Sequence, residues 1–380
     1  MIYLDNAATT GRKPEEVIEA VTEAMRSLSV NAGRGSYALA RKASDLMDEC
    51  RQRLLKLAKI HSGYHVFFAP SATIAMNQLI LGMTCDSYST VYVSPFEHNA
   101  VMRPIQAICD VKGCTFQQLP FDRQNWAFNA TEAESLFLQK RPDYVFVSMV
   151  SNTTGFILPL AQIISLAHNY GAKVIVDCAQ AMGSLDVDFA GLDADAYVFA
   201  GHKTLYGPYG IAGILLSERW KDPSGISGGT GTDSLRLTMP PFHAGGFEPG
   251  SPNLPAIAGL NAALCWIEQT TVQQIEQHER SLITSLSNKL ASMGNIQLYL
   301  PPEDRCSNMI AFNVRDYESR DVGQILDEEF DIGVRTGYQC APLVHDWLGS
   351  KSYGGLVRLS VSYFNTQDDM DSAYKALATL

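Results

Sequence analysis

The chain has 380 residues, of which 46% are hydrophobic and 18% charged, so it can bury a large core and is long enough for more than one domain. Its formal net charge of −11 would repel a phosphate backbone, and no local run of Lys and Arg offsets it, so we expect no nucleic-acid partner. The start, MIYLDNAATT, lacks the features of a signal peptide, and no apolar stretch approaches the roughly 20 residues of a membrane helix, so we expect a cytoplasmic protein without a membrane partner.

Short apolar runs alternate with helical patterns between about residues 64 and 216. The runs are HVFFA, TVYVS, YVFVSMV, KVIVD, AYVFA and IAGILLS, and the helical segments between them include 98–111 and 159–170. This alternation predicts an α/β fold with a mainly parallel sheet covered by helices. KVIVD and YVFVSMV are almost wholly apolar, as strands buried on both faces are, so we place them in the middle of the sheet.

Polar residues follow three of these runs, where a parallel strand would end. After FFA, the turn Pro-Ser-Ala-Thr opens an apolar helical pattern, so Ser71 and Thr73 either cap that helix or bind an anion at its start. His98 follows TVYVS and Asn152 follows YVFVSMV, and each is either a site residue or a satisfied polar residue at a strand end. Open α/β folds place their sites at this edge of the sheet.

Asp177 ends the run KVIVD, and Lys203 follows AYVFA and the turn Gly201-His202. Both side chains are expected in the crevice at the carboxyl ends of the strands. Taken singly, Asp177 would be a loop anchor and Lys203 a solvated charge. Together, and with Gln180 nearby, they indicate pyridoxal 5′-phosphate, because an acid facing the pyridine nitrogen lets the ring accept electrons.

The composition changes after residue 217. A Gly/Pro-rich stretch comes first, with DPSGISGGTGT and MPPFHAGGFEPGSPNLP, followed by helices near 255–294 and a strand near 308–314. We interpret the stretch as an active-site loop region and a domain boundary. The expected division is a large domain over 29–250 and a small domain formed by 1–28 and 251–380.

The cysteines are scattered through the chain, which favours reduced thiols over a disulfide framework. They lie at positions 50, 85, 109, 114, 178, 265, 306 and 340. Cys109 and Cys114 are spaced too loosely for a zinc knuckle, and no second pair follows to complete four ligands. We therefore expect no metal site.

From YLDNAATT at residue 3 to VRLSVSYFNT ending at residue 366, the chain resembles the class V aminotransferase and cysteine desulfurase family of fold-type I pyridoxal-phosphate enzymes. The resemblance implies a large domain with a mainly parallel, seven-stranded type of sheet and a smaller α+β C-terminal domain. It implies that Lys203 holds the cofactor covalently and that Asp177 faces the pyridine nitrogen. The other matching cofactor positions are His98 over the ring, Asn152 and Gln180 near its oxygen, Ala72 and Thr73 in the phosphate turn, and His202 beside the lysine.

The segment GGTGT resembles one that, in relatives, reaches the cofactor phosphate of the other subunit. It offers Thr230 and also Thr232, and it implies a homodimer with shared active sites. One position departs from the family, because relatives carry Ser or Thr three residues before the lysine and this chain has Ala200. One hydrogen bond to the phosphate should therefore be missing.

VRTGYQCAPL resembles the RTG-x-x-C-A segment of the second group of desulfurases, which implies that Cys340 is a nucleophile on a mobile loop and not an inert loop cysteine. Arg358, in GGLVRLSVSYFNT, matches the arginine that binds the substrate α-carboxylate, although a purely structural salt bridge would also explain a buried arginine there. Asn152 and Arg34, the latter in NAGRGSYALA, match further substrate contacts. Histidines of many relatives are replaced here by Tyr338 and Gln339.

The resemblance implies conversion of L-cysteine to L-alanine, with Lys203, His98 and Cys340 catalytic and the sulfur held on Cys340 as a persulfide for an acceptor protein or thiol. A selenocysteine lyase, acting on L-selenocysteine, uses the same scaffold, and no residue distinguishes the two. The sequence also leaves open an aminotransferase or lyase without persulfide chemistry, and a catalytically silent scaffold protein.

Overall fold

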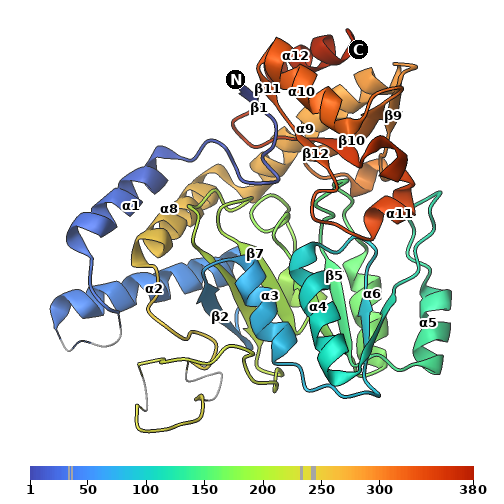
Figure 1. Cartoon of the computed structure of the whole chain (residues 1–380). Coiled ribbons are helices and arrows are strands. Elements are labelled where there is room, and N and C mark those ends of the chain that lie inside the picture. Colours follow the sequence, from blue (N-terminus) through green and yellow to red (C-terminus); the bar gives the residue numbers. More distant parts are fainter. Residues whose placement is uncertain (33–34, 36, 232–233, 241–244) are drawn as a thin grey trace.

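A seven-stranded sheet forms the centre of the computed structural model, which describes residues 1–32, 35, 37–231, 234–240 and 245–380 (Figure 1). The strand order is β2-β8-β7-β6-β5-β3-β4. The strands are β2 (Tyr64–Ala69), β3 (Thr90–Val93), β4 (Thr115–Gln118), β5 (Tyr144–Ser148), β6 (Lys173–Asp177), β7 (Ala196–Ala200) and β8 (Ala212–Ser217). β8 runs antiparallel to β2 and β7, and the remaining pairs are parallel, which confirms the predicted mainly parallel sheet.

The predicted central strands are correct, since β6 is the middle strand and β5 lies beside it. Successive residues of a strand face opposite sides, so Val174 and Val176 join one hydrophobic core and Ile175 joins the other. Both cores exclude water from the β6 side chains, which explains why its sequence is apolar throughout. β4 was not among the predicted strands, because TFQQ carries only one large apolar residue.

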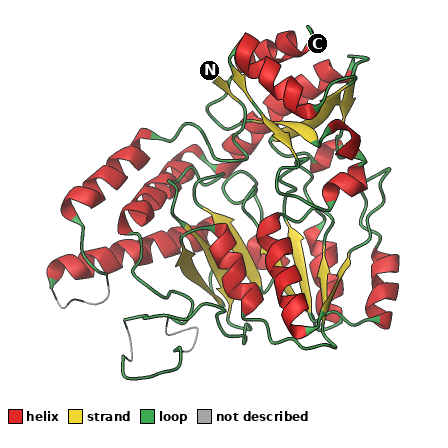
Figure 2. Ribbon diagram, in the orientation of Figure 1, coloured by secondary structure: helices red, strands yellow, loops and turns green. Residues whose placement is uncertain are grey.

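Helices cover both faces of this sheet (Figure 2). The core on one face includes side chains of α3 (Ala72–Leu81) and α4 (Asn99–Lys112). The core on the other includes side chains of α2 (Ala38–Leu57), α6 (Leu160–Asn169) and α8 (Leu254–Thr270). The remaining helices nearby are α1 (Glu15–Ser27), α5 (Ala130–Gln139) and the short α7 (Phe189–Leu192). None of the described helices has the length and apolar character that crossing a membrane requires.

A smaller antiparallel sheet of order β12-β13-β10-β9 lies toward the C-terminus, as the predicted α+β part requires. Its strands are β9 (Ile296–Leu298), β10 (Met309–Val314), β12 (Arg335–Gly337) and β13 (Leu356–Ser360). The helices of this region are α9 (Val272–Ala291), α10 (Ser319–Phe330), α11 (Val344–Leu348) and α12 (Gln367–Leu377), with short 3₁₀ turns at Glu303–Arg305 and Ser350–Tyr353. The domain limits at 28/29 and 250/251 stay a prediction.

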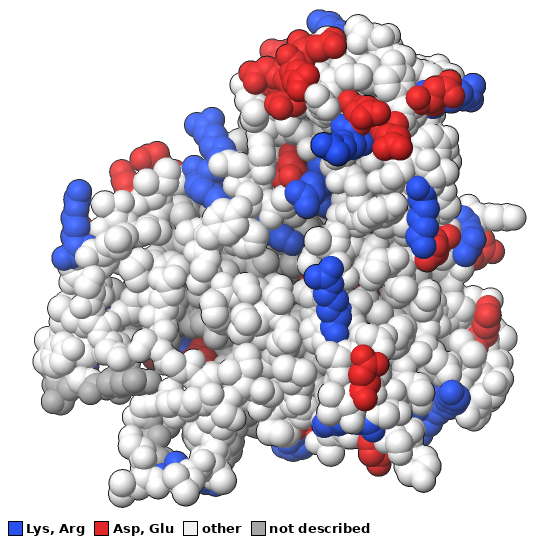
Figure 3. All heavy atoms as spheres, viewed as in Figure 1, with Lys and Arg blue, Asp and Glu red and all other residues white. Residues whose placement is uncertain are grey.

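The N-terminal segment is built into the C-terminal region (Figure 1). β1 (Ile2–Tyr3) pairs in parallel with β11 (Ile332–Gly333), and Asp5 forms an isolated bridge with Ser360. Leu4 is fully buried in the C-terminal core. On the face shown in Figure 3, acidic side chains gather over the end that carries α10 and α12. The negative charge of the chain is therefore not spread evenly over this face.

Phe96 anchors an aromatic cluster that joins α11 to the large sheet. Its ring centroid lies 5.0 Å from that of Trp347 in α11, 5.2 Å from Phe156 and 5.3 Å from Phe121. Phe96 is completely buried, whereas Trp347 retains some exposure. Aromatic pairs at these distances add to the free energy of burial, so the cluster fixes the position of the segment that follows residue 340.

We expect Phe96→Ala to lower the free energy of unfolding by about 3–5 kcal/mol, because it removes a buried ring and leaves a cavity. Leu138→Ala on α5 is the control, since Leu138 is 73% exposed. Urea unfolding followed by circular dichroism measures both variants. Equal shifts of the two midpoints would contradict the role given to the cluster.

Candidate active site

A cavity of about 280 Å³ opens at the carboxyl ends of the strands of the large sheet. Most of the residues predicted for a site line this one cavity, although they come from distant parts of the chain. They are Ala72, Thr73, His98, Asn152, Asp177, Gln180, His202, Lys203, Cys340 and Arg358. Ala7, Ala200 and Arg335 also line it. Arg34 and Thr232 lie outside the described residues.

Lys203 and Asp177 lie deep in the protein, and their accessible surface faces the cavity. Burial lowers the pKa of Lys203, although the charge of Asp177 acts in the opposite direction. Burial likewise raises the pKa of Asp177, while a hydrogen bond from Ala179 N–H and the charge of Lys203 lower it. The Ala179 N–H donates to Asp177 Oδ1 over 2.9 Å. The site therefore holds an amine that gives up its proton more readily than a surface lysine does.

His98 is the N-cap of α4, and its Nδ1 accepts a hydrogen bond from Ala100 N–H over 2.9 Å. This bond places the ring proton of the neutral imidazole on Nε2. Burial lowers the pKa of His98 to about 4, with further lowering by Lys203 and Arg358. His98 is therefore neutral at neutral pH, and its ring orientation is fixed by the start of the helix.

Arg358 pairs with Asp5 across the ends of the chain. Its Nη2 lies 2.6 Å from Asp5 Oδ1, and its Nη1 donates to the Asn152 carbonyl over 2.6 Å. The Arg358 side chain is 3% exposed, and its Nε has no hydrogen-bond partner among the described residues. The structural salt bridge is thus present, while one donor remains for a ligand.

Cys340 lies in a tight turn after β12 and is exposed. Gln339 and Cys340 have φ values of 47° and 57°, a left-handed backbone that non-glycine residues adopt at a cost of about 1–3 kcal/mol each. Hydrogen bonds hold the turn: Asn99 N–H donates to the Cys340 carbonyl over 2.7 Å, and Asn152 Nδ2 donates to the Gln339 carbonyl over 2.8 Å. The strain and these bonds fix where the thiol is presented.

Gln339 and Tyr338, which the sequence predicted to depart from the family pattern, have structural partners in this turn. Gln339 is buried, and its Nε2 donates to the Leu356 carbonyl over 3.2 Å. The exposed Tyr338 ring packs edge-on against His345, whose Nε2 lies 2.9 Å from the Tyr338 carbonyl. Both residues therefore support the conformation of the segment that carries Cys340.

The start of α3 supplies anion-binding geometry. Ser71 is the N-cap and accepts a hydrogen bond from Ile74 N–H over 3.3 Å, and Ala72 and Thr73 form the first turn beside the cavity. The backbone N–H groups of a first helical turn have no partner within the helix and favour negative charge. Ala200 is 3% exposed and presents no hydroxyl to the cavity.

Buried polar atoms around the cavity lack partners among the described residues. They are Asn152 Oδ1, Gln180 Oε1, His202 Nδ1, Gln339 Oε1 and Arg358 Nε. Such atoms lower stability unless a ligand or water bonds them. Together with a buried amine, a facing carboxylate and an anion-binding turn, they fit pyridoxal phosphate and an amino-acid substrate. The described residues contain no cluster of three or more side chains able to hold a metal ion.

Glu97 carries no sequence signal beyond being a charged residue after an apolar strand, yet it is 1% exposed and is hydrogen-bonded to Ser148, which lines the cavity. Ser94 Oγ donates to its Oε1 over 2.5 Å and Ser148 N–H over 2.7 Å, while Ser148 Oγ donates to Oε2 over 3.1 Å. Burial raises the pKa of Glu97 to about 7, and the charge of Asp177 adds to this. Glu97 is thus a second carboxyl group close to the predicted pyridinium partner.

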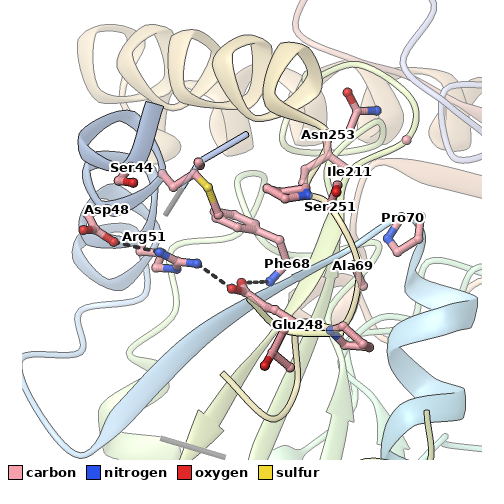
Figure 4. Close-up of a pocket in the computed structure, with 17 residues that line it drawn as sticks. Ser44, Asp48, Arg51, Phe68, Ala69, Pro70, Ile211, Glu248, Ser251 and Asn253 are labelled. Atoms are coloured by element: carbon pink, nitrogen blue, oxygen red, sulfur yellow. Dashed lines mark hydrogen bonds and ion pairs between the residues drawn. The ribbon is translucent and has the colours of Figure 1, made fainter. Parts of the chain in front are cut away.

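Thr230 does not line this cavity but a second one of about 480 Å³ (Figure 4). There Arg51 pairs with Glu248 and Asp48, each over 2.7 Å, and Phe68 N–H donates to Glu248 over 2.7 Å. This location separates Thr230 from the other predicted cofactor residues within one chain.

The model of the family described as "Aminotransferase class-V" matches residues 2–372. A cysteine desulfurase of Escherichia coli O127:H6 is 33% identical over 396 residues, covering 98% of this chain and 91% of that protein. A cysteine desulfurase of Salmonella agona is 30% identical, covering 100% of this chain and 93% of that protein. The apo structure of a cysteine desulfurase from Thermococcus onnurineus superposes with a TM-score of 0.89 at 28% identity, covering 100% of this chain and 94% of the other. A cysteine desulfurase structure from Escherichia coli superposes with a TM-score of 0.81 at 26% identity, covering 99% of this chain and 94% of the other.

We expect Asp5→Asn to lower the free energy of unfolding by about 3–5 kcal/mol, because it leaves the buried Arg358 charge without its partner. Asp331→Asn is the matched control, since Asp331 pairs with the exposed Met1 amino group. It should change stability by no more than about 1 kcal/mol. Urea unfolding at neutral pH measures the stability of both variants. A larger loss of stability in Asp331→Asn than in Asp5→Asn would contradict the role given to the Asp5–Arg358 pair.

Glu97 makes stability depend on pH. The folded protein retains the Glu97 proton up to about pH 7, whereas an unfolded chain loses it at about pH 4.3. The folded state binds more protons between these values, so this contribution makes stability fall as pH rises through the interval. Glu97→Gln should abolish that slope, and its free energy of unfolding should exceed that of the wild type by up to about 4 kcal/mol at pH 8, with no difference near pH 4.

Unfolding midpoints of the apoprotein across pH 4–8 test this expectation. Glu19→Gln, at an exposed position of α1, controls for the loss of one carboxylate. A constant difference between Glu97→Gln and wild type at every pH would show that Glu97 does not titrate in this range.

Proposed function

This chain belongs to the class-V aminotransferase family, and from that premise we propose that it is a cysteine desulfurase that uses pyridoxal 5′-phosphate, Lys203 and Cys340. The observation that carries the proposal is the meeting of a buried amine and an exposed, positioned thiol at one cavity. Relatives that match nearly the whole chain are cysteine desulfurases, which supports the same activity here. We further propose that the chain belongs to the second desulfurase group, which the similarity of VRTGYQCAPL to the RTG-x-x-C-A segment supports.

Different cavity residues would bind different parts of the cofactor. When bound, pyridoxal phosphate forms a covalent bond with an amine and accepts electrons from bonds broken at the attached carbon. Lys203 would hold it, and Asp177 would face its ring nitrogen. The first turn of α3, with Ala72 and Thr73, would bind the phosphate. His98 would cover the ring as a neutral imidazole, which adds no positive charge to that face.

Lys203 is also the proposed general base. Burial lowers its pKa, so a larger fraction of the amine is unprotonated at neutral pH than in an exposed lysine. The neutral amine can take the Cα proton of the substrate and return a proton later. The opposing effect of Asp177 keeps the same amine able to act as an acid.

Arg358 and Asn152 would bind the substrate backbone. The free Arg358 Nε can donate to the α-carboxylate, and the Asn152 Oδ1 can accept from the amine of the substrate. The Asn152 carbonyl and Asp5 fix the guanidinium before substrate arrives, so little side-chain entropy is lost on binding. Arg34 is a third proposed contact.

Cys340 would receive the sulfur. Its thiolate attacks the substrate sulfur, a new S–S bond forms, and the substrate C–S bond breaks with its electron pair retained by the carbon fragment. Protonation of that fragment gives alanine, and Cys340 keeps one additional sulfur atom as a persulfide. An acceptor protein or small thiol must then remove this sulfur, and the exposure of Cys340 permits that contact.

We also propose that the protein is a homodimer with shared active sites. Thr230 lies away from the cavity of its own chain, which is consistent with a contact to the cofactor phosphate of a second subunit. L-Selenocysteine offers the same carboxylate and amine as L-cysteine, and parallel assays with both amino acids distinguish the two activities. A cytoplasmic location stays part of the proposal.

We expect Cys340→Ala to form alanine from cysteine at least about 100-fold more slowly than the wild type, because the nucleophile is lost. Cofactor binding should be retained, since the other cavity residues are unchanged. Cys265→Ala, remote from the cavity, is the control. Alanine assays and the intact mass of the protein after incubation with cysteine provide the readouts, and wild-type activity of Cys340→Ala would refute the assignment.

We expect Ala200→Ser to bind pyridoxal phosphate more tightly, by at most about 1.5–3 kcal/mol, since it restores a hydroxyl donor to a charged phosphate. Ala200→Val adds volume without a donor and should show no gain. Cofactor titration of the apoproteins gives the dissociation constants. An unchanged constant for Ala200→Ser would mean that other groups already satisfy the phosphate.

A further inference from the structure

Three cysteines meet at the edge of the large sheet opposite the cavity. Cys109 lies in the last turn of α4, Cys114 directly precedes β4, and Cys85 lies in the loop after α3 (Figure 1). The Cys114 Sγ is 3.1 Å from the Cys109 Sγ and 4.0 Å from the Cys85 Sγ. β4 is parallel to β3, and Cys114 directly precedes the first residue of β4. The three cysteines therefore lie at the amino ends of these strands, and the length of the strands separates them from the carboxyl ends.

The three thiols differ in exposure. Cys85 is partly exposed, whereas Cys109 is 8% and Cys114 is 4% exposed. Burial raises the pKa of Cys85 to about 11 and that of Cys109 to about 12. These two thiols are therefore protonated at neutral pH, and a dissolved reagent meets Cys85 first. The Lys112 charge lowers the pKa of Cys85, while Asp143 raises it.

The local backbone allows Cys109 and Cys114 to approach further. Gly113 between them has φ 77°, and its N–H donates to the Cys109 carbonyl over 2.8 Å, so the chain reverses at the end of α4. A disulfide has an S–S length of about 2.05 Å, so the two sulfur atoms need to move together by about 1 Å. That displacement is within the reach of side-chain rotation at a helix end.

We propose that Cys85, Cys109 and Cys114 form a site of reversible oxidation, in which a low-molecular-weight disulfide is reduced and a Cys109–Cys114 disulfide is the final product. Cys85 attacks the reagent, forms a mixed disulfide and releases one thiol. Cys114 then attacks the Cys85 sulfur and releases the second thiol. Cys109 attacks the Cys114 sulfur and restores the Cys85 thiol. Overall, two electrons and two protons pass from Cys109 and Cys114 to the reagent.

Glutathione disulfide is the probe for the full-length, fully reduced protein. After the reaction, free thiols are alkylated and the peptides are identified by mass spectrometry. Trypsin cleaves after Lys112 but not between Arg103 and Pro104, so Cys85 and Cys109 share one peptide and Cys114 falls in the next. A Cys109–Cys114 bond and a Cys85–Cys114 bond link the same two peptides, and fragment ions that locate the alkylated cysteine distinguish them. We expect this linked pair with the loss of two hydrogen atoms, free Cys85, and full reversal by dithiothreitol.

Single serine variants separate the steps. Cys114→Ser should stop at the mixed disulfide on Cys85, and Cys109→Ser should stop at a Cys85–Cys114 disulfide. Cys85→Ser should still form the Cys109–Cys114 bond, but about tenfold more slowly, since only buried thiols remain. Cys306 is partly exposed, and its Sγ donates hydrogen bonds to the Pro301 and Pro302 carbonyls, each over 3.4 Å. It should give only a mixed disulfide.

Circular dichroism of each variant confirms that it is folded before the reaction is scored. The proposal is overturned if the folded wild type retains glutathione on Cys85 under excess reagent, or if Cys109 and Cys114 stay reduced while Cys306 reacts.

Discussion

The Lys203 amine is surrounded by protein, and its charge must be offset by groups near it. Lys203 can be positioned deep at the carboxyl edge of the sheet only because the carboxylate of Asp177 lies near it and partly offsets the loss of hydration. Arg358 adds a second buried positive charge, and Asp5 adds a second negative one. Glu97, with its pKa raised to about 7, can remain protonated without upsetting this balance. The site is therefore a set of buried charges that stabilise one another, and changing one of them alters the pKa values of the rest.

The sheet could be predicted where burial leaves a mark on the sequence. The middle strands are apolar because both faces are covered, and the predicted helices at 98–111 and 159–170 correspond to α4 at 99–112 and α6 at 160–169. β4 could not be predicted, because an edge strand with half of its surface exposed needs no apolar run. Local composition reports the immediate environment of a residue and not its pairing partner.

The same limit applies to the candidate site. Polar residues at strand ends predicted the edge at which the cavity lies, since parallel topology alone brings those ends together. The partners of Arg358 could not be predicted, because Asp5 is 353 residues away in sequence and no periodicity links them. Glu97 was hidden for another reason: its partners Ser94 and Ser148 lie at the ends of different strands, and only the folded sheet brings them together. The contact proposed for Thr230 requires a second chain, which no pattern within one chain describes.

The contact between the N-terminal segment and the C-terminal region also determines the order in which parts of the chain can fold during synthesis. Asn6 bonds the Ser360 carbonyl and the Asn365 side chain, at sequence separations of 354 and 359, and Ala7 N–H bonds Ser360 Oγ. A chain leaving the ribosome can form its large sheet early, because those strands come from one continuous stretch. The segment that starts with Ile2 must wait for β13, which is synthesised after all strands of the large sheet. The cavity walls contributed by Ala7 and Arg358 therefore close only after every strand of the large sheet has been synthesised, which leaves the nascent sheet open to chaperones until then.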